Sequence, residues 1–375
     1  MSIVTSFSMF RVILADVVPK NIPKPQVERH FAELVKLIET LGGMSVVKVI
    51  QRRGRPSGST YLGTGKADEV AALAKEMKVD GVIINGMLKG SQIHNLSQKI
   101  TCALWDRVDV ILNIFDRHAT TAEAKLQIQR ARIEYDIAKL YRRDAKTLFE
   151  RERGGRGTVV RGSGERGIEA ERRHIREQIR RIDEKIAEMR LQRKNRRDRR
   201  RRNGLLTAVL VGYTNAGKSS VMRALTGKDV LVADKLFATL DTRMGAIWLP
   251  NLMQKMLIGD TIGFIENLPP NLIAAFQSTL EEATEADVLL HIFDASETLK
   301  EQKRKHRVVR DILRDLDCIQ PILQVGNKID LLSANQIQRL EKKSGIIAVS
   351  AEGKMGLEKL IETIEKTVGR SSTPH

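Results

Sequence analysis

The sequence predicts an α/β protein in which a P-loop domain is preceded by a small α/β domain and a long helical hairpin. Three observations support this fold class. An apolar run at 205–211 leads into a G-x-x-x-x-G-K-S loop and then into a helical pattern. Strand-like and helix-like segments alternate from residue 10 to residue 106. Between these regions, two long helical patterns flank a stretch rich in glycine and arginine.

The chain length, the cysteine content and the apolar runs limit the class of protein. A chain of 375 residues is long enough for two or three domains with cores of their own. Cys102 and Cys318 are too few and too far apart for a disulfide framework or a zinc cluster, so we interpret them as small buried residues. No apolar run approaches the length of a membrane span, and no basic segment precedes the apolar N-terminal stretch. We therefore expect a cytoplasmic protein without a signal peptide or an integral membrane segment.

The positive charge is confined to the first part of the chain. The net charge is +18, yet residues 204–375 contain 21 Lys or Arg and 21 Asp or Glu. A neutral domain therefore follows a basic module that is suited to a polyanion. Because the basic segment is dominated by arginine and poor in bulky apolar residues, RNA fits it better than a membrane surface, which is the alternative.

The first domain is expected to span residues 1–117. Its pattern predicts strands and helices in alternation, with one segment that resembles a phosphate loop. Gly63-Thr64-Gly65-Lys66 lacks the required spacing, and we interpret it as a turn that starts a helix. The expected strands are 10–18, 44–50, 81–85 and 103–106, and the expected helices are 26–41, 67–78 and 91–99.

Residues 118–203 are predicted to form the hairpin. The segment 108–143 reads as helical over most of its length, with a strand as the alternative at its start. A second helix is expected from Ile168 to Arg202, packed against a helix that begins near Ala119. Its apolar stripe is narrow and consists of Ile168, Ile175, Ile179, Ile182, Ile186 and Met189.

The stretch 151–167 between these helices is too polar and too rich in glycine to bury a core. It is either a flexible linker or a mobile basic loop that contacts RNA, and its charge density favours the loop. The run 196–202, interrupted only by Asp198, is either a solvated face or a second polyanion contact. The candidate RNA contacts in the loop are Arg151, Arg153, Arg156, Arg161 and Arg166.

The P-loop carries the strongest signal. Gly212 and Gly217 let the backbone approach a ligand, so that successive N–H groups and a helix N-terminus face phosphate oxygens. Lys218 adds a positive charge at the β- and γ-phosphates, and Ser219 offers a hydroxyl to Mg2+. The predicted nucleotide contacts are Gly212, Tyr213, Thr214, Asn215, Ala216, Gly217, Lys218, Ser219 and Ser220.

The base is indicated by Asn327-Lys328-Ile329-Asp330, which follows an apolar strand. The Asp330 carboxylate would accept from the guanine N1–H and the exocyclic amine, and adenine has neither donor there. Asn327 would bond the other edge of the base and connect loops, while the Lys328 stem covers the ring. Ser350, Ala351 and Glu352 would support the base through backbone groups. The P-loop domain, expected at 204–370 before a tail at 371–375, therefore reads as a GTPase domain.

Two switch segments are expected between these motifs. Asp260-Thr261-Ile262-Gly263 is a D-x-x-G motif, in which Asp260 would hold Mg2+ through water and the Gly263 N–H would reach the γ-phosphate. The first switch is expected at Phe237, Ala238, Thr239, Leu240 and Asp241. Thr239 is favoured as the hydroxyl that completes the Mg2+ shell, with Thr242 as the alternative. The catalytic residues are thus predicted to be Lys218, Thr239 and Gly263.

Phe264 follows the D-x-x-G motif, where many signalling GTPases carry a glutamine that orients the attacking water. A phenylalanine side chain has no group for this task. We expect slow intrinsic hydrolysis and a catalytic arrangement that a partner completes.

Motifs in both halves resemble the HflX family of translation-factor-class GTPases, over nearly the whole chain. They are Tyr61-Leu62-Gly63-Thr64-Gly65-Lys66, Ser91-Gln92 with Asn95-Leu96, Asp106-Arg107, Leu126-Gln127 with Glu134-Tyr135, the glycine-rich loop, and Phe237-Ala238-Thr239-Leu240-Asp241. The sequence departs from the family where Arg166-Gly167 follows Gly164-Glu165 and where Thr242 follows Asp241, and we expect it to lack the family's C-terminal extension.

The resemblance implies a monomeric, ribosome-associated enzyme. Members of this family bind the large ribosomal subunit and its rRNA, are stimulated by it as GTPases, and split stalled or idle ribosomes. The resemblance also implies that residues 154–166 point into the peptidyl-transferase region. One alternative is a GTP-regulated RNA-binding or ribosome-assembly scaffold with little turnover, and another is a peripheral membrane GTPase.

Overall fold

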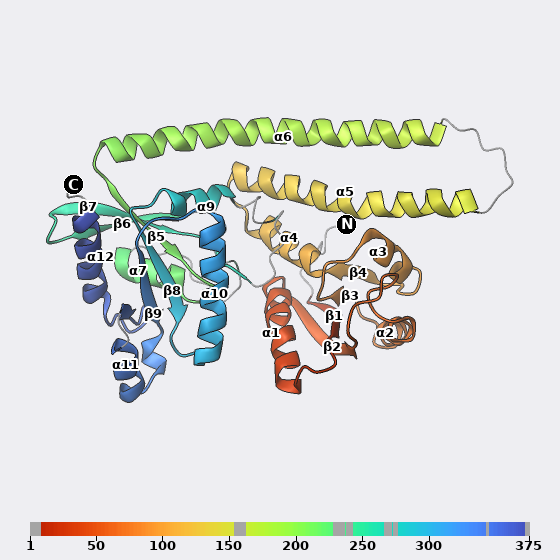
Figure 1. Ribbon diagram of the computed structural model, residues 1–375, viewed down its shortest axis with the longest axis horizontal. Coiled ribbons are helices and arrows are strands. Elements are labelled where there is room, and N and C mark those ends of the chain that lie inside the picture. Colours follow the sequence, from red (N-terminus) through yellow and green to blue (C-terminus); the bar gives the residue numbers. More distant parts are fainter. Residues whose placement is uncertain are drawn as a thin grey trace. The chain divides into compact units, whose positions relative to one another are not determined.

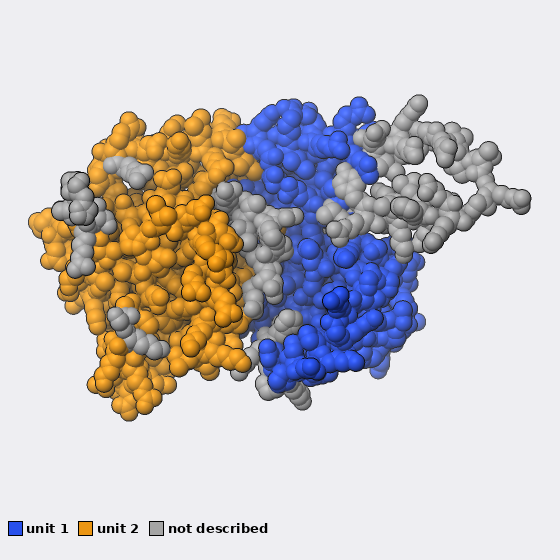
Figure 2. All heavy atoms as spheres, viewed as in Figure 1, with its two compact units in different colours: residues 1–117, 126–185 blue, residues 118–125, 186–375 orange. Residues whose placement is uncertain are grey.

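The computed structural model describes residues 9–153, 163–227, 237, 243–265, 272, 277–342 and 345–371. The chain forms two compact units, which Figure 2 shows in blue and orange. The first contains residues 1–117 and 126–185, and the second contains residues 118–125 and 186–375. Each has helices around a sheet that is wholly or mostly parallel, so the predicted α/β fold class is confirmed.

The sheet of the first unit has four parallel strands in the order β2-β1-β3-β4 (Figure 1). β1 lies inside the sheet and is buried along almost its whole length, because helices cover parallel sheets on both faces. Gly63 precedes α2 as its N-cap, which agrees with a turn and helix start at that position. The elements are β1 (Phe10–Val18), α1 (Lys24–Thr40), β2 (Gly43–Arg52), α2 (Thr64–Glu76), β3 (Gly81–Ile84), α3 (Gly90–Ser97) and β4 (Ala103–Asp106).

Asp106 ends β4 and is fully buried. Its Oδ1 accepts from the backbone N–H groups of Val108 at 2.9 Å and Asp109 at 3.1 Å. Its Oδ2 accepts from the Leu88 N–H at 2.9 Å and from the Tyr135 hydroxyl. Burial, followed by the charge of Asp109, raises the pKa of Asp106 to about 6. One carboxyl group thus joins the end of the sheet to the helix that carries Tyr135.

A second polar cluster surrounds Asp16 near the end of β1. Asp16 accepts from the Tyr61 hydroxyl at 2.8 Å and from Asn85 Nδ2 at 3.0 Å. Arg107 donates to Asn85 Oδ1 at 3.1 Å and to Glu33 Oε2 at 2.5 Å. The polar side chains at this edge of the sheet therefore bind one another.

α4 (Arg107–His118) precedes the predicted hairpin, whose helices are α5 (Ala122–Arg153) and α6 (Ser163–Arg202). α5 and α6 are antiparallel: Arg130 pairs with Asp183 at 2.5 Å in the first unit, and Glu123 pairs with Arg193 at 2.6 Å in the second. The long helix begins at Ala122 rather than near Ala119. The predicted loop at 151–167 is helical at both ends, because the Glu and Arg residues there favour helix.

The sheet of the second unit has six strands in the order β10-β9-β8-β5-β7-β6, and only β6 is antiparallel to its neighbour. Residues of α7 and α12 share one core with residues of β5, β7 and β8. The elements are β5 (Leu206–Val211), α7 (Lys218–Thr226), β6 (Arg243–Leu249), β7 (Gln254–Asp260), α9 (Gln277–Thr284), β8 (Val288–Asp294), α10 (Leu299–Asp315), β9 (Ile322–Asn327), the 3-10 turn η1 (Ile329–Leu331), α11 (Ala334–Glu341), β10 (Ile346–Ala348) and α12 (Leu357–Ser371).

Candidate nucleotide-binding site

The carboxyl ends of four parallel strands bring the predicted motifs of the second unit together. In the strand order β9-β8-β5-β7, these ends carry Asn327, Asp294, the P-loop and Asp260. The register places Asp294 opposite Asn327 and Leu210 opposite Asp260. Open α/β sheets bind ligands at this edge, so the topology assembles a site from residues more than 100 positions apart.

The P-loop needs its two glycines for steric reasons. Gly212 has φ 153°, and a Cβ there would lie 2.2 Å from the Ile292 carbonyl oxygen. Gly217 has φ 88°, and a Cβ there would lie 2.2 Å from Asn327 Nδ2. Gly217 is the N-cap of α7, and no side chain caps this helix. The first N–H groups of α7 are therefore available to an anion.

Lys218 is the first residue of α7, and its side chain folds back over the loop. Its Nζ donates to the carbonyl oxygens of Gly212 and Tyr213, both at 3.1 Å. Burial lowers the pKa of Lys218 to about 8, while Asp260 opposes the shift. His291 of β8 lies close by, and burial, with His306 and Lys218 nearby, lowers its pKa to about 3. Lys218 is thus the cation of this pair at neutral pH.

Ser219 and Asp260, the two predicted Mg2+ residues that the structure describes, are in direct contact. The Ser219 hydroxyl donates to Asp260 Oδ2 at 2.6 Å, and Asp260 is fully buried. The adjacent Thr261 hydroxyl donates to the Leu210 carbonyl at 2.7 Å, which ties the D-x-x-G segment to β5. A hydroxyl and a carboxylate are oxygen ligands of the kind that Mg2+ prefers, so this pair fits the ion.

The end of the D-x-x-G segment is attached to the P-loop through its backbone. The Thr214 N–H donates to the Phe264 carbonyl at 2.8 Å, and the Phe264 N–H donates to the Gly212 carbonyl at 3.1 Å. A Cβ on Gly263 would lie 2.7 Å from Thr214 Cγ2 and 2.9 Å from Lys218 Nζ. Phe264 is buried, so its ring belongs to the core.

Asn327 connects the loops around the expected base site. Its Nδ2 donates to the Ala216 carbonyl at 3.1 Å, and its Oδ1 accepts from the Ala351 N–H at 3.1 Å. Asp330 is exposed, and its Oδ1 accepts from the Ser350 hydroxyl at 2.5 Å. The structure thus brings together the N-K-x-D and S-A-E motifs and leaves the Asp330 carboxylate accessible.

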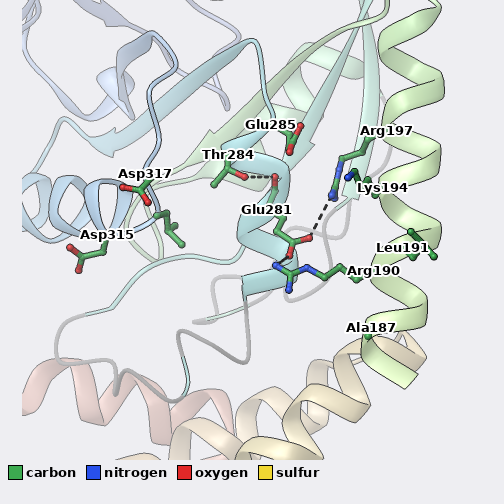
Figure 3. Close-up of a pocket in the computed structure, with 11 residues that line it drawn as sticks. Ala187, Arg190, Leu191, Lys194, Arg197, Glu281, Thr284, Glu285, Asp315 and Asp317 are labelled. Atoms are coloured by element: carbon green, nitrogen blue, oxygen red, sulfur yellow. Dashed lines mark hydrogen bonds and ion pairs between the residues drawn. The ribbon is translucent and has the colours of Figure 1, made fainter. Parts of the chain in front are cut away.

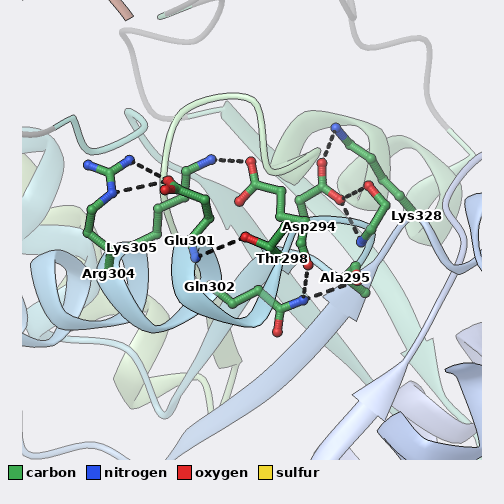
Figure 4. A network of polar contacts seen from close by, with 10 residues as sticks. Asp294, Ala295, Thr298, Glu301, Gln302, Arg304, Lys305 and Lys328 are labelled. Carbon is green, nitrogen blue, oxygen red and sulfur yellow. Dashed lines mark hydrogen bonds and ion pairs between the residues drawn. The ribbon is translucent and has the colours of Figure 1, made fainter. Parts of the chain in front are cut away.

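Asp294 was not singled out from the sequence, although it ends a buried strand at the correct edge of the sheet. Its Oδ2 pairs with Lys328 Nζ at 2.8 Å, and its Oδ1 accepts from Ser296 (Figure 4). Burial opposes ionisation, but the hydrogen bonds from Lys328 and Ser296 hold the pKa of Asp294 below its usual range. Asp294 therefore fixes the lysine whose stem is expected to cover the base.

The first switch is described at one position only. Phe237 is buried and has φ 58°. Ala238, Thr239, Leu240, Asp241 and Thr242 lie outside the described residues, so the choice between Thr239 and Thr242 stays a prediction. Arg156 and Arg161 also lie outside them, and for Arg151, Arg153 and Arg166 the structure defines only the helical backbone.

The arginines at the end of α6 fall on two faces. Arg190, Arg193, Arg197 and Arg200 recur at helical spacing and pair with Glu281 and Glu282 of α9. Figure 3 shows Arg190 and Arg197 reaching Glu281 of α9, beside a groove of about 720 Å3 that Lys194 also lines. Arg196 and Arg199 are exposed. The predicted polyanion contact at 196–202 is therefore partly occupied by acids of the same unit, which the sequence pattern did not reveal.

Neither a cluster of metal-binding side chains nor a membrane-spanning helix occurs in the part of the chain that the structure describes. Within the described ranges, no group of three or more His, Cys, Asp or Glu side chains has a metal-binding arrangement. Among the described helices, none combines the length and the apolar character that a membrane span requires.

This fold and this set of motifs define a P-loop GTPase, as predicted from the sequence. Three family models match in order: GTP-binding GTPase N-terminal at 28–116, GTP-binding GTPase Middle Region at 118–200, and 50S ribosome-binding GTPase at 207–328. The chain belongs to the HflX family of GTPases, which confirms the resemblance.

Two relatives illustrate this membership. The chain is 39% identical over 346 residues to GTPase HflX of Caldanaerobacter subterraneus subsp. tengcongensis, covering 92% of this chain and 78% of the relative. It is 38% identical over 363 residues to GTPase HflX of Magnetococcus marinus, with 96% and 83% covered. A solved structure, the crystal structure of SsGBP and GDP complex, matches with a TM-score of 0.53 at 22% identity, covering 97% of this chain and 100% of that one. At this identity the structural likeness supports the fold alone.

Proposed function

We propose that this GTPase binds GTP and Mg2+ at the carboxyl edge of the second sheet and acts, as a monomer, on the large ribosomal subunit. The P-loop from Gly212 to Ser220 would bind the phosphates, and Asp330 would read guanine. Ser219, Thr239 and, through water, Asp260 would hold Mg2+. The ion would neutralise charge that develops on the phosphates during transfer.

The ribosomal part of the proposal is supported by similarity and by charge. The family model that matches residues 207–328 is described as a 50S ribosome-binding GTPase. The net charge of +18 lies entirely before residue 204, and α6, which is rich in arginine, leads directly into β5 and the P-loop. The single observation that carries the proposal is this continuity of an arginine-rich helix with a nucleotide site.

We further propose that binding of the hairpin end to rRNA stimulates hydrolysis and that the protein separates the subunits of stalled or idle ribosomes. Arg151, Arg153, Arg156, Arg161 and Arg166 would contact RNA phosphates or stack on bases. In the GTP-bound state, the switch segments would be ordered by the γ-phosphate, and phosphate release would allow the protein to dissociate.

The test is the rate of GTP hydrolysis with and without purified large subunits, with small subunits as the matched control. Wild type should be stimulated by large subunits only. Lys218→Ala should be inactive under both conditions, and deletion of residues 154–164 should retain the basal rate but lose the stimulation. Light scattering of intact ribosomes then measures subunit separation, and an unchanged signal with GTP would contradict the splitting activity.

A second candidate is a GTP-regulated RNA-binding or assembly scaffold with little turnover. The observation that favours it is the buried Phe264, which leaves the position after Gly263 without a polar side chain. A scaffold would bind large subunits in the presence of GTP without faster phosphate release. Stimulated turnover would exclude this candidate.

A further inference from the structure

Thr214 carries a hydroxyl for which the contacts proposed above have no use. It is the third residue of the P-loop and is 5% exposed. Among the described residues, its Oγ1 is a buried atom without a hydrogen-bond partner. Buried polar groups are nearly always hydrogen-bonded, and exceptions in native folds are associated with function or with a ligand.

The side chain of Thr214 lies beside the groups expected at the γ-phosphate. A Cβ on Gly263 would lie 2.7 Å from Thr214 Cγ2, 2.8 Å from Thr214 Cα and 2.9 Å from Lys218 Nζ. The side chains of Thr214 and Lys218 therefore flank the same glycine. The hydrogen bond from the Thr214 N–H to the Phe264 carbonyl fixes the threonine backbone in this position.

Several polar groups around Gly263 already have hydrogen bonds. Phe264 has an apolar side chain, and both of its backbone polar groups are bonded to the P-loop. Asp260 accepts from Ser219, and the Thr261 hydroxyl donates to Leu210. The Thr214 hydroxyl is thus a group without a hydrogen bond among the described residues, on a side chain that lies next to Gly263.

We propose that Thr214 is a catalytic residue that orients the attacking water. The inference rests on the nucleotide site proposed above. The water oxygen forms a bond to the γ-phosphorus, and the bond from that phosphorus to the bridging oxygen breaks with its electron pair leaving on GDP. Both water hydrogens leave with the released phosphate, as dihydrogen phosphate. Thr214 accepts a hydrogen bond from the water and takes no proton.

Three substitutions separate the hydroxyl from the shape of the side chain. Thr214→Val keeps the β-branched shape and removes the hydroxyl, Thr214→Ser keeps the hydroxyl, and Thr214→Ala removes both. Hydrolysis is measured as a single turnover, with the full chain in excess over GTP and no ribosomes present. Affinities for fluorescent GTP and GDP analogues, and for GDP with aluminium fluoride, are measured in parallel.

We expect the Val and Ala variants to hydrolyse GTP about tenfold more slowly, which is the effect of losing one hydrogen bond in the transition state. The Ser variant should remain within about threefold of wild type. GTP and GDP affinities should be unchanged in all three, whereas the complex with aluminium fluoride, which mimics the transferred phosphoryl group, should be weaker in Val and Ala.

A Val variant with the wild-type rate would overturn the assignment. So would a Ser variant as slow as Val, because the hydroxyl would then be irrelevant. A loss of GTP affinity equal to the loss of rate would make Thr214 a binding residue instead. If wild type itself retained no guanine nucleotide, the nucleotide site would fail, and that result is distinguishable from failure of Thr214 alone.

Discussion

The two sheets have polar residues at their carboxyl edges, but they use them in different ways. In the first unit, Asp106 accepts four hydrogen bonds from protein groups, and the start of α3 is satisfied because Gln92 Oε1 accepts from the Lys89 N–H at 2.8 Å. In the second unit, no side chain caps α7, and the carboxylate of Asp330 is exposed. One edge is internally satisfied and the other is open to a ligand.

This difference shows that parallel-sheet topology alone does not define a site. Both edges lie where α/β proteins bind ligands. What distinguishes the second is steric and electrostatic: two P-loop glycines with positive φ and a buried lysine at the start of α7, since α2 of the first unit also lacks a side-chain cap. Substitutions at the open edge should therefore change nucleotide chemistry, and substitutions at the satisfied edge should change stability.

The largest effect is expected from Lys218→Ala, at the open edge. Loss of the charge near the β- and γ-phosphates should lower the hydrolysis rate at least about 10³-fold, or about 4 kcal/mol of transition-state stabilisation. Phosphate release under single-turnover conditions measures this. The first unit should unfold as in wild type. A hydrolysis rate within tenfold of wild type would contradict the assignment of nucleotide chemistry to the open edge.

The converse substitution is Asp106→Ala, at the satisfied edge. It leaves the N–H groups of Leu88, Val108 and Asp109 and the Tyr135 hydroxyl without their acceptor, which should destabilise the first unit by about 3 kcal/mol. Urea unfolding followed by tryptophan fluorescence measures the loss of stability. A Trp248→Phe background leaves Trp105 of β4 as the single tryptophan, so the signal reports the first unit. GTP affinity should not change. Tyr135→Phe, the matched control, should cost only about 1 kcal/mol.

The same carboxyl group predicts a pH dependence. The folded pKa of Asp106, about 6, lies above its ordinary value of 3.8, so the folded state binds the proton more tightly. Its contribution to stability is complete below pH 3.8 and is lost as pH rises through 6. The difference in unfolding free energy between wild type and Asp106→Ala should thus shrink by about 2 kcal/mol from pH 4 to pH 7. A difference that grows over this range would contradict the assignment.

The smallest effect concerns the arginines of α6. Glu282 faces Arg197 at 3.8 Å and Arg200 at 3.5 Å. Glu282→Gln should destabilise the second unit by about 1 kcal/mol, with a smaller effect at high salt. Guanidinium would mask the ion pairs, so urea unfolding is the suitable measurement. A variant as stable as wild type at low salt would show that these pairs are not structural.

The periodic features of the fold could be predicted from the sequence. Phe10–Val18 and Ala103–Asp106 have the predicted strand boundaries because apolar runs and turn residues mark them. The sequence prediction starts α5 about three residues early, although Thr121 caps the helix through its hydroxyl, which accepts from the Ala124 N–H at 3.2 Å. Helix also extends into the predicted glycine-arginine loop at both ends, because charged helix formers outweigh local glycine there.

The residues of the nucleotide site also fall into two groups: those that the sequence predicts and those that only the fold reveals. Motifs with fixed spacing, such as the P-loop and N-K-x-D, indicated their residues directly. Asp294 and the pairs from α6 to Glu281 and Glu282 depend on strand order and helix packing, which no local pattern encodes. The unpartnered hydroxyl of Thr214 likewise became visible only with the fold, since it depends on the approach of Gly263.

The most direct test of the account is the base preference of wild type and Asp330→Asn, measured with fluorescent GTP, XTP and ATP. The Asp330 carboxylate should accept from the guanine N1–H and amine, so wild type should prefer GTP by at least about 10³-fold. An asparagine amide can donate to the xanthine C2 oxygen, so the variant should prefer XTP. Equal affinity of wild type for ATP and GTP, or an unchanged preference in the variant, would contradict a guanine nucleotide site at the open edge of the second sheet.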